Sequence, residues 1–181
     1  MREAALKIEN GAPRVMSTAR LYGIRMSSLD FPDMWELNDD PSVAASISPT
    51  GAPLPEADQQ RALERHIAHW EQHGFGLYVL HRVKDGAVIG YCGLISRLID
   101  GEPETDVAYA LKPAYWGHGY GTEAARKVVD VAFRSLHLPN VVCLVQPANK
   151  ASRHVADKCG FQFEKHVDHA GLPHLFYRLH A

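Results

Sequence analysis

A run of ten residues, Tyr115–Ala124 (YWGHGYGTEA), has the composition of an anion-binding turn. Three glycines, Gly117, Gly119 and Gly121, fall within it between an expected strand and an expected helix. Glycine lacks a Cβ atom, so a backbone built from it turns tightly and approaches a ligand closely. The free N–H groups of such a loop, with the dipole of the helix that Thr122 is expected to cap, attract negative charge. The run therefore predicts a site for a phosphate-bearing ligand.

Other interpretations of this run compete with that one. The nucleotide-triphosphate loop GxxxxGK[ST] is absent from the sequence. Gly119, Gly121 and Ala124 match the loose dinucleotide fingerprint. A dinucleotide fold, however, needs this turn after its first strand and an acidic residue about 20 positions later, and the sequence meets neither condition. A tight connection that binds no ligand is the remaining alternative.

Hydrophobic periodicity predicts the elements that must position this loop. Strands are expected over residues 19–26, 77–83, 87–96, 105–111, 141–145, 161–167 and 174–179, and helices over 30–38, 55–73, 122–136 and 149–158. Their order predicts an α+β (mixed α/β) domain. We expect a central mixed, mostly antiparallel sheet of about seven strands with helices on both faces. Residues 1–16 are expected to form a loose N-terminal tail and residues 17–181 a single domain.

The glycine run resembles the acetyl-coenzyme A loop of the GNAT N-acetyltransferase superfamily, and most closely that of its Rim-like branch of ribosomal-protein N-terminal acetyltransferases. In that branch an acidic residue, an alternating strand and a proline precede the loop, as Asp106–Leu111 and Pro113 do here. A second block, Asn149–Ser152 (NKAS) followed by Lys158–Phe161 (KCGF), also matches. The resemblance covers about residues 17–179 and implies a GNAT-like fold.

The resemblance implies transfer of an acetyl group from acetyl-coenzyme A to a primary amine, by direct attack in a ternary complex. It implies that the backbone of Tyr109, Ala110 and Leu111 holds the pantetheine arm and the developing oxyanion. The pyrophosphate is then expected on the loop residues Gly117, His118, Gly119, Tyr120, Gly121 and Thr122. Asn149 and Ser152 are expected beside the thioester. No metal is predicted.

Two departures from the family pattern bear on the chemistry. Trp116 stands where many GNAT enzymes have Arg or Gln, as is common in the Rim-like branch. Ala156 stands where many of them have the tyrosine that protonates the leaving thiolate. Ser152 is therefore the candidate acid, although a serine at a helix start also serves as an ordinary backbone cap.

Two carboxylates are candidates for the base that takes the proton of the amine. Asp106 occupies the position of the Rim-like acid, and Glu104 lies two residues earlier, on the same side of the strand. Either one is equally well read as a solvated acid of an edge strand. Asp168 and His169, before the last strand, are further candidates.

Histidines and cysteines are the other reactive side chains of the chain. Three histidines fall on one arc of an expected helix: His66, His69 and His73. Three interpretations of them compete: a metal site, a lining of the acceptor site and a polar flank of the helix. The three cysteines are too few and too widely spaced for a disulfide framework, which favours a cytoplasmic protein.

Charge and composition limit the partners. The net charge of −2 argues against general nucleic-acid binding, and no run of about 18 apolar residues predicts a membrane span. Residues 30–71 hold nine acids and two arginines, whereas residues 112–160 hold seven basic residues and three acids. An acidic half beside a basic half favours a cationic amine acceptor, either a protein N-terminal α-amine or a small cationic amine. The alternative interpretation of these charges is two solvated helix faces.

For the whole chain, the alternative function is a catalytically weak or inactive acyl-coenzyme A sensor of the same fold. A homodimer is possible in this family.

Overall fold

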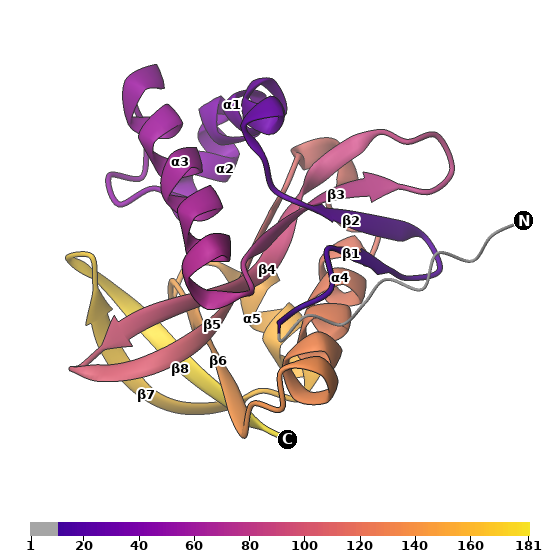
Figure 1. The fold of residues 1–181 in the computed structure, drawn as a ribbon. Helices are drawn as coiled ribbons and strands as arrows, with labels where there is room; N and C mark the ends of the chain where they lie inside the picture. Colours follow the sequence, from indigo (N-terminus) through magenta and orange to yellow (C-terminus); the bar gives the residue numbers. More distant parts are fainter. Residues whose placement is uncertain (1–10) are drawn as a thin grey trace, which may run out of the picture.

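The computed structural model describes residues 11–181. Within this range one sheet of eight strands runs through the molecule in the order β1-β2-β3-β4-β5-β6-β8-β7 (Figure 1). The strands are β1 (Val15–Ser17), β2 (Leu21–Arg25), β3 (Leu77–Arg82), β4 (Val88–Ile99), β5 (Glu102–Leu111), β6 (Asn140–Val145), β7 (Gln162–His169) and β8 (Leu172–His180). Neighbouring strands are antiparallel except β5 and β6, which are parallel. The expected mixed, mostly antiparallel sheet is confirmed.

The sheet has one more strand than the sequence predicted. Val15–Ser17 pairs with β2, and Met16 is buried in the core, although Val15 and Met16 had been expected in the tail. Residues 1–10 of the expected tail lie outside the described part of the chain. The hairpin of β4 and β5 is also longer than predicted, because Asp100 and Gly101 both adopt positive φ angles and form a tight turn between them.

Helices cover both faces of the sheet, as expected (Figure 1). They are α1 (Phe31–Asp39), α2 (Pro41–Ile47), α3 (Glu56–His73), α4 (Tyr120–Asp130) and α5 (Lys150–Cys159). Strand β5 shows the division, because its alternate residues enter different clusters. Val107 and Leu111 pack in the cluster that holds buried residues of α4 and α5, whereas Ala110 packs with α1 and α3.

Two helices differ from the sequence prediction. Helix α2 was not predicted; it begins at Pro41, and the Asp40 carboxylate accepts hydrogen bonds from the backbone N–H groups of Ser42 and Val43. Helix α4 begins at Tyr120 instead of Thr122, and after Asp130 it widens into a π-helical turn over Val131–Ser135. Thr122 therefore lies inside the first turn and does not cap the helix.

Within residues 11–181, no helix is both long and apolar enough to cross a bilayer.

Candidate active site

The two parallel strands at the middle of the sheet separate soon after they meet. β5 and β6 pair at one position, where Asp106 lies opposite Val142. Two residues further along β6, the backbone N–H of Leu144 donates a hydrogen bond of 3.3 Å to the Asp106 carboxylate and not to the backbone of β5. The carboxylate therefore lies between the strands, and Tyr109–Leu111 of β5 follow where the strands have parted. Backbone groups at such an opening are available to a ligand.

The glycine loop follows β5 directly and ends at the N-terminus of α4. Gly117 and Gly119 have φ angles of 75° and 79°, a left-handed conformation that favours glycine. Gly119 is the residue before the helix, and its carbonyl accepts the N–H of Glu123. The N–H groups of Tyr120, Gly121 and Thr122 precede that bond, so they belong to the first turn and are free to bind an anion.

A basic groove of about 690 Å³ runs beside this turn. It is lined by Ser17–Arg20 from the β1–β2 connection, by Gly119, Thr122, Glu123, Arg126 and Lys127 around α4, and by Lys158 of α5. Four cations and one acid face it. A Cβ atom added at Gly117 would meet no atom within 4 Å, so the loop is open on that side. The groove and the free N–H groups suit a ligand that carries several phosphates.

Arg20 and Glu123 join the β1–β2 connection to the glycine loop. The Nε atom of Arg20 donates to Glu123 at 2.6 Å, and its Nη1 atom donates to the carbonyl of His118 at 3.0 Å. Thr18 donates to the same carboxylate at 2.6 Å, and the Arg20 guanidinium lies over the ring of Tyr120. Although burial opposes it, hydrogen bonds from Thr18 and Arg20 lower the pKa of Glu123. This contact, 103 residues apart in sequence, was not predicted.

Ser152 lies in the first turn of α5, the helix that follows β6 in the chain. Its backbone N–H donates to the Asn149 side chain at 2.9 Å, so Asn149 caps the helix. Its Oγ atom accepts a hydrogen bond of 3.0 Å from the hydroxyl of Tyr109 on β5. Burial raises the pKa of Tyr109 well above its usual range, so this hydroxyl keeps its proton. The sequence analysis assigned only the backbone of Tyr109 to the site, and the side chain was missed.

Both predicted base candidates have cationic partners. Asp106 is 3% exposed, and the Nε atom of Arg97 lies 2.6 Å from its Oδ2 atom. Arg178 of β8 donates to both carboxylate oxygens of Glu104, at 2.6 and 3.0 Å. The two candidates differ in position: Asp106 lies where β5 and β6 part, and Glu104 lies two residues earlier on β5.

The further candidate His169 contacts the same arginine as Asp106, because Arg97 Nη1 lies 3.4 Å from its Nε2 atom. Burial and the charge of Arg97 lower the pKa of His169. The side chain of Asp168 is exposed on β7. His169 therefore contacts the arginine that pairs with Asp106, whereas Asp168 does not.

Of the three helical histidines, His69 has both of its ring nitrogens engaged by backbone groups. The Nδ1 atom of His69 lies 2.9 Å from the carbonyl of Phe75, and its Nε2 atom accepts the N–H of Ser96. Both ring nitrogens of His69 are thereby occupied, which removes it from the metal hypothesis. Within residues 11–181 no group of three His, Cys, Asp or Glu side chains is arranged around a common metal position.

Comparison with known proteins gives a family. A family model described as an acetyltransferase (GNAT) domain matches residues 20–162. The uncharacterized N-acetyltransferase p20 of Bacillus licheniformis is 30% identical over 149 residues, which cover 81% of this chain and 82% of that protein. The uncharacterized protein YkkB of Bacillus subtilis (strain 168) is 30% identical over 108 residues, 57% of this chain and 63% of YkkB. The chain thus spans less than two thirds of that relative.

Solved structures share the fold. An acetyltransferase from Agrobacterium tumefaciens str. C58 has a TM-score of 0.80 and 25% identity over 100% of both chains. RimL, a ribosomal L7/L12 α-N-protein acetyltransferase in complex with coenzyme A, has a TM-score of 0.76 and 15% identity over 92% of this chain and 97% of that chain. The chain belongs to the GNAT acetyltransferase family, and the Rim-like resemblance of its motifs agrees with the shared RimL fold.

Proposed function

We propose that the chain is an acetyl-coenzyme A-dependent N-acetyltransferase that modifies a primary amine in a ternary complex. The observation that carries the proposal is the opening between β5 and β6, which lies beside the free N–H groups of the glycine loop. Acetyl-coenzyme A supplies the activated acetyl group as a thioester. The loop residues 117–122 and the basic groove bind its phosphates, and the backbone of Tyr109–Leu111 binds the pantetheine arm and the carbonyl oxygen.

Ser152 is the proton donor of this proposal. A hydroxyl oxygen that accepts from Tyr109 keeps its own proton free to be donated elsewhere. The same hydrogen bond stabilises the serine oxygen as it loses that proton, because Tyr109 stays protonated. The pair therefore supplies a proton to the departing thiolate, the task that a tyrosine at position 156 performs in many relatives.

Asp106 is the preferred base because it lies where the strands part and faces the side of α1 and α3. Its carboxylate is already paired with Arg97, so an acceptor amine that is already partly unprotonated near neutral pH requires the least from it. An α-amine titrates near pH 8, about two units below a lysine side chain. We therefore propose an N-terminal α-amine or a small amine of similar basicity as the acceptor. The role of Glu104 is secondary, since it lies two residues before the point where β5 and β6 part, and Arg178 holds its carboxylate there.

The second candidate function is an acyl-coenzyme A-binding sensor without turnover. The observation that favours it is that both carboxylates are held in ion pairs. We also place the protein in the cytoplasm, because Cys92, Cys143 and Cys159 are free thiols.

The experiment that separates these functions measures two quantities on the same protein. Calorimetry measures binding of acetyl-coenzyme A, and release of coenzyme A is followed with peptides, polyamines and aminoglycosides as acceptors. Binding with turnover on at least one amine supports the enzyme, and binding without turnover on any of them supports the sensor. Absence of binding would contradict both.

A further inference from the structure

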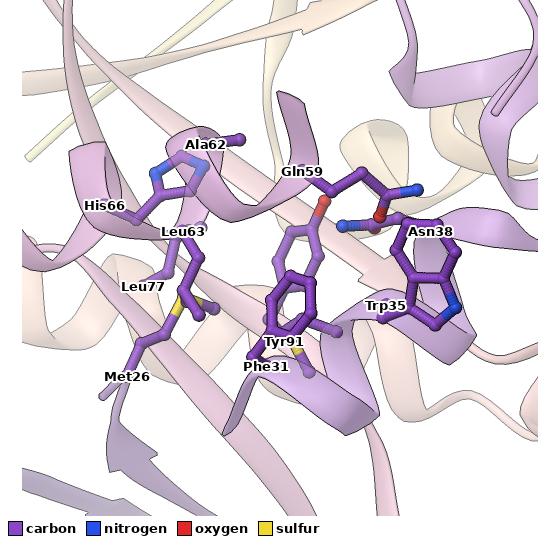
Figure 2. Close-up of a pocket in the computed structure, with 11 residues that line it drawn as sticks. Met26, Phe31, Trp35, Asn38, Gln59, Ala62, Leu63, His66, Leu77 and Tyr91 are labelled. Carbon is purple, nitrogen blue, oxygen red and sulfur yellow. The ribbon is translucent and has the colours of Figure 1, made fainter. Parts of the chain in front are cut away.

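A small cavity of about 30 Å³ lies between α1 and α3, above strands β3 and β4. Figure 2 shows the side chains of Asn38, Gln59, His66 and Tyr91 around it, among aromatic and aliphatic groups. None of these residues belongs to the glycine loop, the basic groove or the Ser152 group. The cavity is therefore a separate feature of the α1–α3 face.

Two oxygen atoms in this cavity have no hydrogen-bond partner. They are Oδ1 of Asn38 and Oε1 of Gln59, the two buried side-chain polar atoms without a partner in the described part of the chain. Gln59 is only 5% exposed, and its Nε2 atom donates to the carbonyl of Leu54 at 3.0 Å. That bond fixes the orientation of the amide, so the atom left over is an acceptor. A buried acceptor without a donor is unfavourable, and a ligand that supplies the donor removes the penalty.

The cavity favours an uncharged donor. No carboxylate and no lysine or arginine is among the residues that line it. Burial and the charge of Arg97 lower the pKa of His66 to about 4, so the imidazole is neutral at pH 7. Burial raises the pKa of Tyr91 to about 12, so its hydroxyl is also neutral and keeps a proton to donate. Surroundings that keep the His66 imidazole uncharged also disfavour the binding of an ammonium group.

The cavity lies one strand away from the proposed reaction centre. Tyr91 on β4 is the cross-strand partner of Ala110 on β5, and directly paired residues point to the same face of a sheet. Ala110 lies in the segment that is proposed to hold the pantetheine arm. Arg97, whose charge acts on His66, is paired with Asp106. The cavity is therefore one strand away from an acetyl group held at Ala110, whereas Asp106 lies four residues earlier on β5, opposite Ile95.

We propose that this cavity binds a neutral carboxamide carried by the amine acceptor close to its reacting nitrogen. A carboxamide NH₂ has two N–H donors, which match the two free oxygens of Asn38 and Gln59, and its carbonyl accepts from the Tyr91 hydroxyl. The aromatic rings of Phe31 and Trp35 cover the apolar stem. This inference rests on the proposed function, because it specifies the acceptor of that reaction.

The first test compares acceptor peptides that share a free α-amine and differ only in the first side chain. Asparagine, leucine and aspartate have similar shapes, and lysine adds a cation. We expect kcat/KM for the asparaginyl peptide to exceed that for the leucyl, aspartyl and lysyl peptides by about tenfold, the worth of one good hydrogen bond. Gln59→Met should bring the asparaginyl and leucyl values to within about twofold of each other, since it removes one acceptor.

Matched variants keep this test interpretable. Gln60→Met removes the neighbouring amide, which pairs with Glu64 on the exposed side of α3, and should preserve the preference. Asn38→Leu removes the second acceptor independently, in case Gln59→Met fails to fold. Melting temperatures of all three variants identify any that are unfolded. A folded Gln59→Met or Asn38→Leu variant that keeps the full preference for asparagine would overturn the proposal.

The second test does not need turnover. The side-chain amide signals of Gln59 and Asn38 are followed by nuclear magnetic resonance while acetamide, methylammonium or acetate is added. We expect saturable shifts with acetamide only. Shifts with methylammonium, or with none of the three probes, would contradict the proposal.

The two tests separate failure of this inference from failure of the proposed function. Active enzyme that shows no preference for the asparaginyl peptide, or prefers the lysyl one, overturns the carboxamide site and leaves the N-acetyltransferase proposal intact. If no amine is acetylated, the proposed function fails. The acetamide titration then decides alone whether a carboxamide site exists.

Discussion

The hydroxyl of Tyr109 on β5 donates a hydrogen bond of 3.0 Å to the Oγ atom of Ser152 on α5. The bond joins β5 to the helix that follows β6 in the chain. It brings a phenol, a group type that the sequence lacks at position 156, to the serine in the first turn of α5. The two hydroxyls therefore form one proton-donating unit in the proposed mechanism.

The unit predicts a specific kinetic pattern. Ser152→Ala should lower kcat more than it raises the KM for acetyl-coenzyme A, because the interaction matters mainly as charge develops on the thiolate. Tyr109→Phe should have a smaller effect in the same direction. Since the two groups act together, the double variant should lose less than the product of the single losses. Steady-state kinetics of the four proteins measures this, and a rise in KM alone would make Ser152 a binding residue.

The glycine loop predicts different effects at two glycines of the same turn. Gly119→Ala should lower the affinity for acetyl-coenzyme A about tenfold and cost about 1 kcal/mol of stability, because Gly119 has a φ angle of 79° at the start of α4. The bulkier Gly119→Val should cost more stability still. Gly121→Ala should change both quantities less, because Gly121 is helical, its N–H is kept in alanine, and the added Cβ would lie 3.4 Å from the ring of Tyr109.

Calorimetry and urea denaturation measure both quantities. Equal affinities for the two alanine variants and the unsubstituted protein would remove the loop from the cofactor site.

Local signals predicted most of this arrangement, and contacts between distant segments were missed. The glycine run and the Asn149–Ser152 block are continuous, so their elements and their order could be read directly. The partner of Glu123 lies 103 residues away and that of Glu104 lies 74 residues away, and no spacing rule identifies either pair.

Two local features were nonetheless overlooked. Asp40 followed by Pro41 is a helix-start signal that predicts α2, and Asp100 followed by Gly101 is a hairpin signal that predicts the full length of β4 and β5. Burial of single atoms, such as Oε1 of Gln59, depends on packing in three dimensions and has no sequence signal.

The contact between Arg20 and Glu123 predicts a pH-dependent contribution to stability. The folded structure lowers the pKa of Glu123, so its contribution is fully present above the unfolded value near 4.3 and is lost as the pH falls through the lower, folded value. Glu123→Gln should therefore reduce the free energy of unfolding by roughly 1–2 kcal/mol at pH 7. The difference from the unsubstituted protein should shrink as the pH falls below about 4.

Urea denaturation between pH 3 and pH 8 tests this expectation. The control is Glu71→Gln, which removes a carboxylate that is 73% exposed in its pair with Arg25 and should change stability by less than about 0.5 kcal/mol. A Glu123→Gln deficit that is the same at every pH would show that lost packing, not the charge, causes it.

The acidic segment over residues 30–71 predicts that salt slows the reaction with a cationic acceptor. Its charges are not equivalent: Asp33 and Glu36 bind Lys112, whereas Asp40 caps α2. Asparagine caps a helix about as well as aspartate, so Asp40→Asn removes a charge and keeps the cap. Asp39 is exposed at the end of α1, which makes Asp39→Asn/Asp40→Asn a charge-only change.

We expect kcat/KM for the acceptor to fall as salt rises from about 0.01 to 1 M, because the screening length shortens from about 30 to about 3 Å. The double variant should start lower at 0.01 M and converge with the unsubstituted protein at 1 M, since electrostatic steering acts only when it is unscreened. Lys84→Gln, in the turn between β3 and β4, is the control for a general change of charge. A kcat/KM that does not change with salt, or a double variant that stays slower at 1 M, would mean that the acidic segment does not guide the acceptor.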